Sequence, residues 1–289
     1  SLIGNAPVDG VDVAALLGIP ISAEQERAVQ APLKPCAVIA GAGTGKTTVM
    51  AARVVWLVAS RLVSPEEILG LTFTNKATAE LSERIESNLT RVGLLTSEQP
   101  RPTVATYDSF AGTLVNDYGA WDGISTGAHL ITGARAYQLA AEVVMGLDKA
   151  PLAATHMGPT FIAQAVVKLA GAMASHDASP GKVRRADARW RQMLLAAPTK
   201  RGGDRYADID KWLSRVDERE ELLDLVAAYQ NLKKERGLVE FGDRMVQALH
   251  LVTHHPRVGE ELRARYRVVL LDEYQDTSSA QEEVISGVF

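Results

Sequence analysis

The sequence is poor in cysteine and in aromatic residues. Cys36 is the one cysteine among 289 residues, and aromatic residues make up 6% of the chain. One cysteine excludes an internal disulfide framework and suits a reducing compartment. No apolar run approaches the roughly 20 residues of a membrane span, and the first residues lack the basic start and apolar core of a secretion signal. We therefore expect a cytoplasmic protein with no membrane contact.

An excess of positive charge is also missing. The formal net charge is −4, which excludes a uniformly basic coat for nucleic acid. One local exception lies at residues 182–205, where eight Lys and Arg residues stand against two Asp residues. Such charge runs are most often solvated helix faces, so this stretch has two open interpretations. The alternative is DNA contact, for which we single out Arg184, Arg185 and Arg189.

What the sequence does contain is an alternation of short apolar runs with helical patterns. The runs predict buried strands at 36–40, 68–74, 103–106 and from Val268. Helices are predicted after the first three strands, the first of them at about 46–60. This alternation indicates an α/β fold with a parallel sheet. Between 119 and 236 almost every segment has a helical pattern. One long helix there is predicted to carry a single apolar stripe, formed by Leu222, Leu225, Val226, Tyr229 and Leu232. We therefore predict a sheet domain at 1–118 plus 237–289, a helical insertion at 119–236, and a last strand that lies beside the strand at 36–40.

The strongest motif is the glycine-rich stretch "VIAGAGTGKTT" at 38–48. It matches the phosphate-loop pattern G-x-x-x-x-G-K-[ST], except that Ala40 takes the first position. Its glycines allow the backbone N–H groups to face an anion, and the following helix adds its positive end. Lys46 is expected to reach the β- and γ-phosphates and Thr47 to ligate Mg²⁺. The candidate nucleotide-binding residues of the loop are Ala40, Gly41, Ala42, Gly43, Thr44, Gly45, Lys46, Thr47 and Thr48.

Two neighbouring carboxylates follow the last apolar run, in "VVLLDEYQDT". Buried charges at a strand end require a partner, and nucleotide-bound Mg²⁺ would supply one. We assign Asp272 to Mg²⁺, Glu273 to the activation of the attacking water, and Gln275 to sensing the γ-phosphate. The histidines and Cys36 have no zinc-ligand spacing, so we expect no metal other than the Mg²⁺ of the nucleotide.

Several motifs in order make the chain resemble the N-terminal motor domain of superfamily one DNA helicases of the UvrD/Rep/PcrA type. That group includes the RecB-like, AddA-like and AdnAB branches. The phosphate loop is similar to motif I and the acidic strand end to motif II. The other similar stretches are "ISAEQERAV" (21–29, Q-motif), "LGLTFTNKATAELSERI" (69–85, motif Ia), "TVATYDSFAGTL" (103–114, motif Ib) and "GLVEFGDRMVQAL" (237–249).

The resemblance implies a RecA-like phosphate-loop sheet with a large all-helical insertion, and Mg²⁺-dependent ATP hydrolysis coupled to movement on DNA. It further implies that Gln25 binds adenine, and that the protein serves DNA repair or recombination on the bacterial nucleoid. Two positions depart from the family pattern. Thr48 replaces an arginine that stacks on adenine, and Asp108 replaces a histidine. The family's second motor domain is also absent from this sequence, so we expect a truncated motor whose isolated activity is weak.

Residues at the ends of the second and third apolar runs are candidates for DNA contact. They lie where open α/β sheets bind ligands, and an aromatic ring there can stack on a base. The alternative is that these residues belong to the core or cap the next helix. The candidates are Thr72, Phe73, Thr74, Asn75 and Tyr107.

These observations lead to one function and one alternative. The first is an ATP-dependent DNA helicase or translocase that contacts single-stranded and duplex DNA, with a nuclease subunit as a possible partner. The alternative is a hydrolysis-deficient scaffold subunit of a helicase–nuclease complex. The presence of Lys46, Asp272 and Glu273 favours the enzyme.

Overall fold

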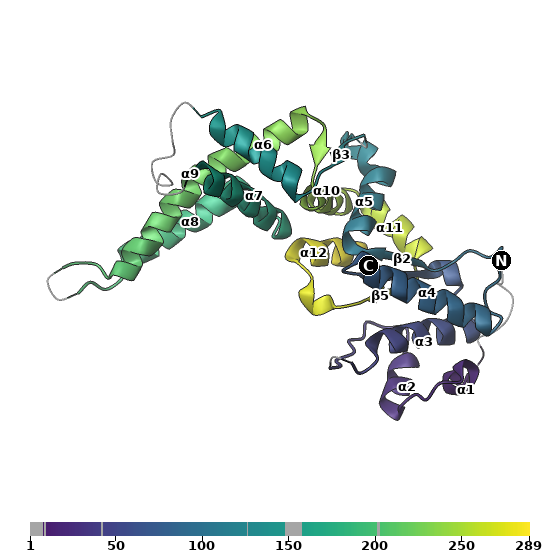
Figure 1. Ribbon diagram of the computed structural model, residues 1–289. Helices are drawn as coiled ribbons and strands as arrows, with labels where there is room; N and C mark the ends of the chain where they lie inside the picture. The colour runs from purple at the N-terminus through teal and green to yellow at the C-terminus, as the bar shows by residue number, and fades with distance from the viewer. Residues whose placement is uncertain (1–7, 9, 42, 126, 148–157, 201–202) are drawn as a thin grey trace. The chain divides into compact units, whose positions relative to one another are not determined.

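A computed structural model describes residues 8, 10–41, 43–125, 127–147, 158–200 and 203–289 (Figure 1). The chain divides into two compact units, which we describe separately. The sheet unit comprises the described residues of Ser1–Thr113, Val252–Thr277 and Ile285–Phe289. The helical unit comprises those of Leu114–Leu251 and Ser278–Val284. None of the described helices is long and apolar enough to cross a bilayer.

The sheet unit is built on three parallel strands in the order β2-β1-β5. β1 is the central strand, with Leu71 opposite Ala105 on one side and opposite Leu271 on the other. All five residues of β1 are buried, as expected of a strand with neighbours on both sides. The strands are β1 (Ile68–Thr72), β2 (Thr103–Thr106) and β5 (Val268–Leu271).

Helices from both ends of the chain complete the sheet unit. α3 and α4 supply apolar side chains to one buried cluster that also includes residues of β1 and β5. The helices in or entering this unit are α1 (Val13–Leu17), α2 (Ala23–Val29), α3 (Lys46–Ala59), η1 (Pro65–Glu67), α4 (Asn75–Arg91), α5 (Tyr107–Tyr118), α11 (Pro256–Arg265), η3 (Tyr274–Asp276) and α12 (Ser279–Val288). The predicted helix at 46–60 and the strand at 103–106 are thus confirmed, and the strand predicted at 68–74 is confirmed over 68–72.

The predicted strand at 36–40 is wrong. This segment has no strand structure, and the side chain of Ile39 is 98% exposed. Among the described residues, no backbone hydrogen bond joins it to β5, which pairs with β1 alone. The expectation that the last strand lies beside 36–40 fails for the same reason. An apolar run favours a strand only where a neighbouring edge pairs with it, and composition does not supply that edge.

The helical unit packs around α9, whose 29 residues span Ala207–Glu235. One face of α9 joins α6 and α7 in a buried cluster through Leu222, Leu225, Val226 and Tyr229. This stripe is the one that the spacing of apolar residues predicts, so the prediction is confirmed. The elements are η2 (Gly119–Asp122), β3 (His129–Leu130), α6 (Gly133–Met145), α7 (Pro159–Ser175), α8 (Pro180–Leu195), α9, β4 (Leu238–Val239) and α10 (Phe241–His254). The short parallel pair β3-β4 was not expected from the sequence.

A buried charged cluster fixes the end of α9 to the segment that follows it. The side chain of Lys233 is 2% exposed, and its ammonium lies 2.7 Å from Glu240 and 2.6 Å from Asp243. The hydroxyl of Tyr229 donates to Glu240 at 2.7 Å. A buried ammonium is tolerated because two carboxylates compensate its charge.

Candidate nucleotide and nucleic-acid site

The phosphate loop has the backbone form that its glycines allow. Gly43 and Gly45 have φ values of 76° and 86°, a region that favours glycine. Gly45 is the N-terminal cap of α3, so the free N–H groups of the first turn follow it directly. The hydroxyl of Thr44 donates to the carbonyl of Gly41 at 2.8 Å and closes the turn. Ala42 lies outside the described residues.

Gln25 joins α2 to this loop. Its amide nitrogen donates to the carbonyl of Thr44 at 3.1 Å, while its amide oxygen accepts from the N–H of Ser22 at 3.0 Å. Ser22 in turn accepts from the N–H of Gln25, which completes a capping box at the start of α2. The predicted adenine-reading residue therefore lies beside the loop, with both ends of its amide already engaged within the protein.

The acidic strand end meets the loop. The N–H of Asp272 donates to Leu71 at 2.9 Å and extends the β5-β1 ladder by one bond. Glu273 follows with φ of 49°, a left-handed conformation that costs a non-glycine residue about 1 kcal/mol. The ammonium of Lys46 lies 3.5 Å from its carboxylate. Gln275 donates to the same carboxylate. These contacts bring Lys46, Asp272, Glu273 and Gln275 into one cluster.

The environment of Asp272 disfavours its charged form. Burial, and then the neighbouring Glu273 carboxylate, raise the pKa of Asp272 above its ordinary value. The N–H of Glu273, which donates to Asp272 at 3.1 Å, and the charge of Lys46 lower it only in part. A divalent cation would reverse this balance, because it stabilises the carboxylate directly.

The donor set fits a Mg²⁺ ion that a nucleotide brings with it. Within the described residues, no three His, Cys, Asp or Glu side chains converge as a metal site. Thr47, on the first turn of α3, offers a hydroxyl, and Asp272 offers a carboxylate. Two such ligands suffice for a cation whose remaining positions are filled by phosphate oxygens and water.

Sequence reasoning missed one residue beside the loop. The guanidinium of Arg84, on α4, donates to the hydroxyl of Thr48 at 2.7 Å. Arg84 is exposed, so a planar cation lies at the edge of the loop where the sequence shows only Thr48. No local pattern could have revealed it, because the contact depends on the packing of α4 against α3.

Residues at the end of β1 and directly after it differ in their accessibility to a DNA strand. Thr72 is fully buried, and its hydroxyl lies 2.6 Å from that of Thr78, so it is not presented to a ligand. Thr74 caps α4 by accepting from Ala77 at 3.0 Å. Asn75 is exposed, and Phe73 is partly exposed. Phe73, Thr74 and Asn75 therefore remain candidates for direct contact, and Thr72 does not.

Tyr107 also lies inside the protein. Its side chain is 3% exposed, and its ring centroid lies 5.0 Å from that of Phe73. Its hydroxyl donates to the backbone carbonyl of Asp272 at 3.4 Å. Burial raises the pKa of Tyr107 well above the ordinary value, and the nearby Asp272 adds to this. A direct contact between Tyr107 and DNA is thus excluded in this conformation.

Acidic residues of α9 neutralise two arginines of the basic stretch on α8. Arg184 contacts Glu220 at 2.6 Å and Asp224 at 2.7 Å, and Arg191 pairs with Asp217. The count of charges within residues 182–205 does not include these three acids, because they lie later in the sequence, on α9. Arg185 and Arg189 are exposed and form no ion pair with any described residue. They are the better candidates for phosphate contact.

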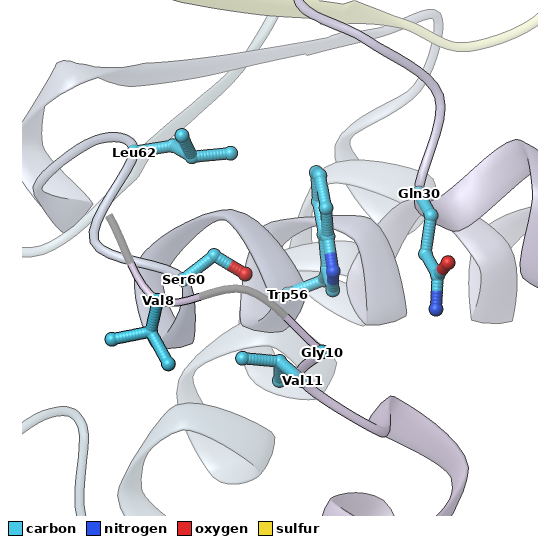
Figure 2. Close-up of a pocket in the computed structure, with 7 residues that line it drawn as sticks. All are labelled: Val8, Gly10, Val11, Gln30, Trp56, Ser60 and Leu62. Atoms are coloured by element: carbon cyan, nitrogen blue, oxygen red, sulfur yellow. The ribbon is translucent and has the colours of Figure 1, made fainter.

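A small cavity lies elsewhere in the sheet unit. It measures about 180 Å³ and is lined by residues of the N-terminal segment, the end of α2, α3 and the turn that follows α3 (Figure 2). The buried hydroxyl of Ser60 has no partner among the described residues. The lining includes Gln30, Trp56 and Leu62 but no residue of the phosphate loop. The cavity is therefore separate from the cluster that contains Lys46 and Glu273.

Comparison with known proteins agrees with this geometry. Residues 21–289 match the UvrD/REP helicase N-terminal domain. The chain belongs to this family. The family assignment confirms the resemblance that the ordered motifs carry.

Named relatives are similar over most of the chain. The chain is 26% identical to a DNA helicase II of Rickettsia typhi and 27% identical to the ATP-dependent DNA helicase UvrD1 of Mycobacterium leprae, over 90% of its length in both cases. It is 28% identical to a DNA helicase II of Haemophilus influenzae over 94% of its length. These matches cover 34%, 29% and 32% of the relatives, so the chain spans about a third of their length.

Proposed function

We propose that this chain is the nucleotide-binding part of an ATP-dependent DNA helicase or translocase, with a RecA-like phosphate-loop sheet and a helical insertion. The observation that carries the proposal is the contact between Lys46 and Glu273 beside the glycine-rich turn. The names of the relatives, which describe DNA helicases, support the same activity.

Each residue of the cluster has a distinct task in this proposal. The N–H groups of the loop and the ammonium of Lys46 bind phosphate oxygens, and Gln25 orients the base. Thr47 and Asp272 hold Mg²⁺. Bound Mg²⁺–ATP supplies the electrophilic phosphorus and the cation that neutralises its oxygens. Because Lys46 can exchange Glu273 for phosphate, the carboxylate of Glu273 is then free to accept a proton from water.

Gln275 keeps Glu273 in place during this exchange. Its amide donates to the Glu273 carboxylate, and the left-handed backbone of Glu273 sets the direction in which that carboxylate leaves the strand. Strained backbone of this kind persists where the surrounding contacts hold it, as at many functional sites.

DNA is proposed to bind at the end of β1 and at α8. Phe73 offers a ring for a base, Thr74 and Asn75 offer polar groups for phosphate, and Arg185 and Arg189 offer cations. Strong stimulation of hydrolysis would require transition-state cations from a second motor domain, which in related reactions contribute about 10³–10⁵ in rate.

The test is ATP hydrolysis by the natural protein that contains these residues, with and without single-stranded DNA. We expect DNA-stimulated hydrolysis that Glu273→Gln abolishes while nucleotide binding persists. The 289-residue chain alone should bind nucleotide and hydrolyse it slowly. Binding without hydrolysis in the natural protein would instead support the scaffold alternative.

A further inference from the structure

Tyr107 connects two parts of the proposed site. Its ring centroid lies 5.0 Å from that of Phe73 at an interplanar angle of 51°, and its hydroxyl donates to the carbonyl of Asp272 at 3.4 Å. The three residues follow β1, β2 and β5, so together they cross the carboxyl edge of the sheet. This is the edge at which open parallel sheets bind ligands.

Phe73 and Tyr107 differ in burial, so DNA can contact the first ring but not the second. Phe73 is partly exposed and can meet a base, whereas Tyr107 is 3% exposed and cannot. A base that stacks on Phe73 therefore acts on Tyr107 only through the ring contact. Aromatic pairs at this separation prefer particular tilts, so a change in the Phe73 ring alters the favoured position of the Tyr107 ring.

The hydrogen bond at the other end of Tyr107 has room to shorten. O–H···O bonds are most often about 2.7–2.8 Å long, and this one measures 3.4 Å. Its acceptor is the backbone of Asp272, the residue whose carboxylate is proposed to hold Mg²⁺. Movement of that carbonyl towards Tyr107 would turn the same residue's side chain. Hydrogen bonds at catalytic sites often tighten only when the ligands are present.

We propose that Tyr107 is a positioning residue that couples stacking of a single-stranded DNA base on Phe73 to the placement of Asp272 at the Mg²⁺–nucleotide. The inference rests on the proposed function. It assigns Tyr107 a role different from the direct DNA contact that its sequence position suggests. Its hydroxyl is the essential group, because the ring alone reaches Phe73 but cannot bond to Asp272.

The coupling can be measured as the change in nucleotide affinity that DNA causes in the 289-residue chain. Titration calorimetry would give the Kd of a non-hydrolysable ATP analogue with Mg²⁺, alone and with a saturating thymidine oligonucleotide of about 16 nucleotides. We expect DNA to change this Kd by at least about 5-fold. Tyr107→Phe should reduce the change to less than about 2-fold, with each ligand's own Kd within about 3-fold of wild type.

Tyr266→Phe is the matched control. Tyr266 is also buried in the sheet unit, and its hydroxyl also makes one long hydrogen bond, to Thr103 at 3.3 Å. This variant should keep the wild-type coupling. Equal loss of coupling in both variants would show a general packing effect, and full coupling in Tyr107→Phe would show that the hydroxyl is not needed. Either result overturns the inference.

Binding measurements on the wild-type chain distinguish failure of this inference from failure of the proposed function. If it binds both ligands but DNA leaves the nucleotide Kd unchanged, Tyr107 has no coupling role although the proposed function stands. If it binds neither ligand, the proposed function fails and the inference fails with it.

Discussion

The ammonium of Lys46 lies 3.5 Å from the carboxylate of Glu273, although the two residues come from opposite ends of the chain. Lys46 is placed by the first turn of α3, and Glu273 by the end of β5. Both side chains are partly exposed, so this ion pair contributes little to folding. We propose that its importance is functional, because in the proposed site a phosphate group replaces Glu273 as the partner of Lys46.

Asp272→Asn is expected to stabilise the fold at neutral pH in the absence of nucleotide. The pKa of Asp272 is raised in the folded chain above the ordinary 3.8, so the folded state binds this proton more readily than the unfolded state. Stability therefore decreases as pH rises from 3.8 through the folded pKa, and the cost is fully present above it. Replacing the carboxylate should raise Tm at pH 7 by about 1–2 °C.

Thermal melts at pH 7 and at decreasing pH would check this sign. The difference from wild type should shrink as the pH falls towards the ordinary pKa. Asp276→Asn, at an exposed carboxylate nearby, is the control and should shift Tm by less than about 0.5 °C. A lower Tm for Asp272→Asn at pH 7 would refute the electrostatic argument.

Ile39→Ser should leave the stability of the chain almost unchanged. The side chain is 98% exposed, so it buries little apolar surface, and the free energy of unfolding should fall by less than about 0.5 kcal/mol. Leu69→Ala, at a fully buried position of β1, should cost about 2–5 kcal/mol. Urea denaturation measures both. A large destabilisation by Ile39→Ser would instead indicate that Ile39 is buried, as the predicted strand at 36–40 requires.

Lys233→Ala should strongly destabilise the helical unit. Its removal leaves the carboxylates of Glu240 and Asp243 without their shared cation, which costs about 3–5 kcal/mol for a buried pair. Lys234→Ala, at the exposed neighbouring position, should stay within about 0.5 kcal/mol of wild type. Denaturant unfolding would measure both variants, and similar destabilisation at the two positions would rule out a stabilising role for the cluster.

Arg185→Ala and Arg189→Ala should flatten the salt dependence of DNA binding. When a substitution removes one cation from a phosphate of duplex DNA, the slope of log K against log salt becomes shallower by about 0.9. Arg184→Ala should change this slope less, because Glu220 and Asp224 already hold its guanidinium. Fluorescence anisotropy at several salt concentrations measures the slopes. An equal effect at all three arginines would mean that the ion pairs do not decide which one binds phosphate.

Local patterns predicted the parts of the fold that depend on neighbouring residues. The glycine-rich turn predicted the start of α3 at Lys46, the apolar spacing predicted the buried face of α9, and "TVAT" predicted β2. These signals work because glycine conformation and helical periodicity are properties of short segments.

Features that depend on distant residues were not predicted. The segment 36–40 has strand composition but no partner edge among the described residues, and Arg84 reaches Thr48 only because α4 packs against α3. The charge of Arg184 looked available because the acids that pair with it belong to α9. The family resemblance is confirmed, but it could not tell the buried Tyr107 from an exposed one.

The most direct test of the proposed nucleotide site, which contains Lys46, Asp272 and Glu273, is Mg²⁺-dependent binding of a non-hydrolysable ATP analogue. Binding is compared between the wild-type chain and Lys46→Ala. Lys76→Ala is the control, because Lys76 is an exposed lysine that pairs with Glu80 at 3.8 Å. We expect wild type and the control to bind the analogue with equal affinity, and to bind it only when Mg²⁺ is present. Lys46→Ala should bind it at least about 10-fold more weakly. Equal binding by all three proteins, or wild-type affinity that is indifferent to Mg²⁺, would contradict a shared site for the phosphate loop and Asp272.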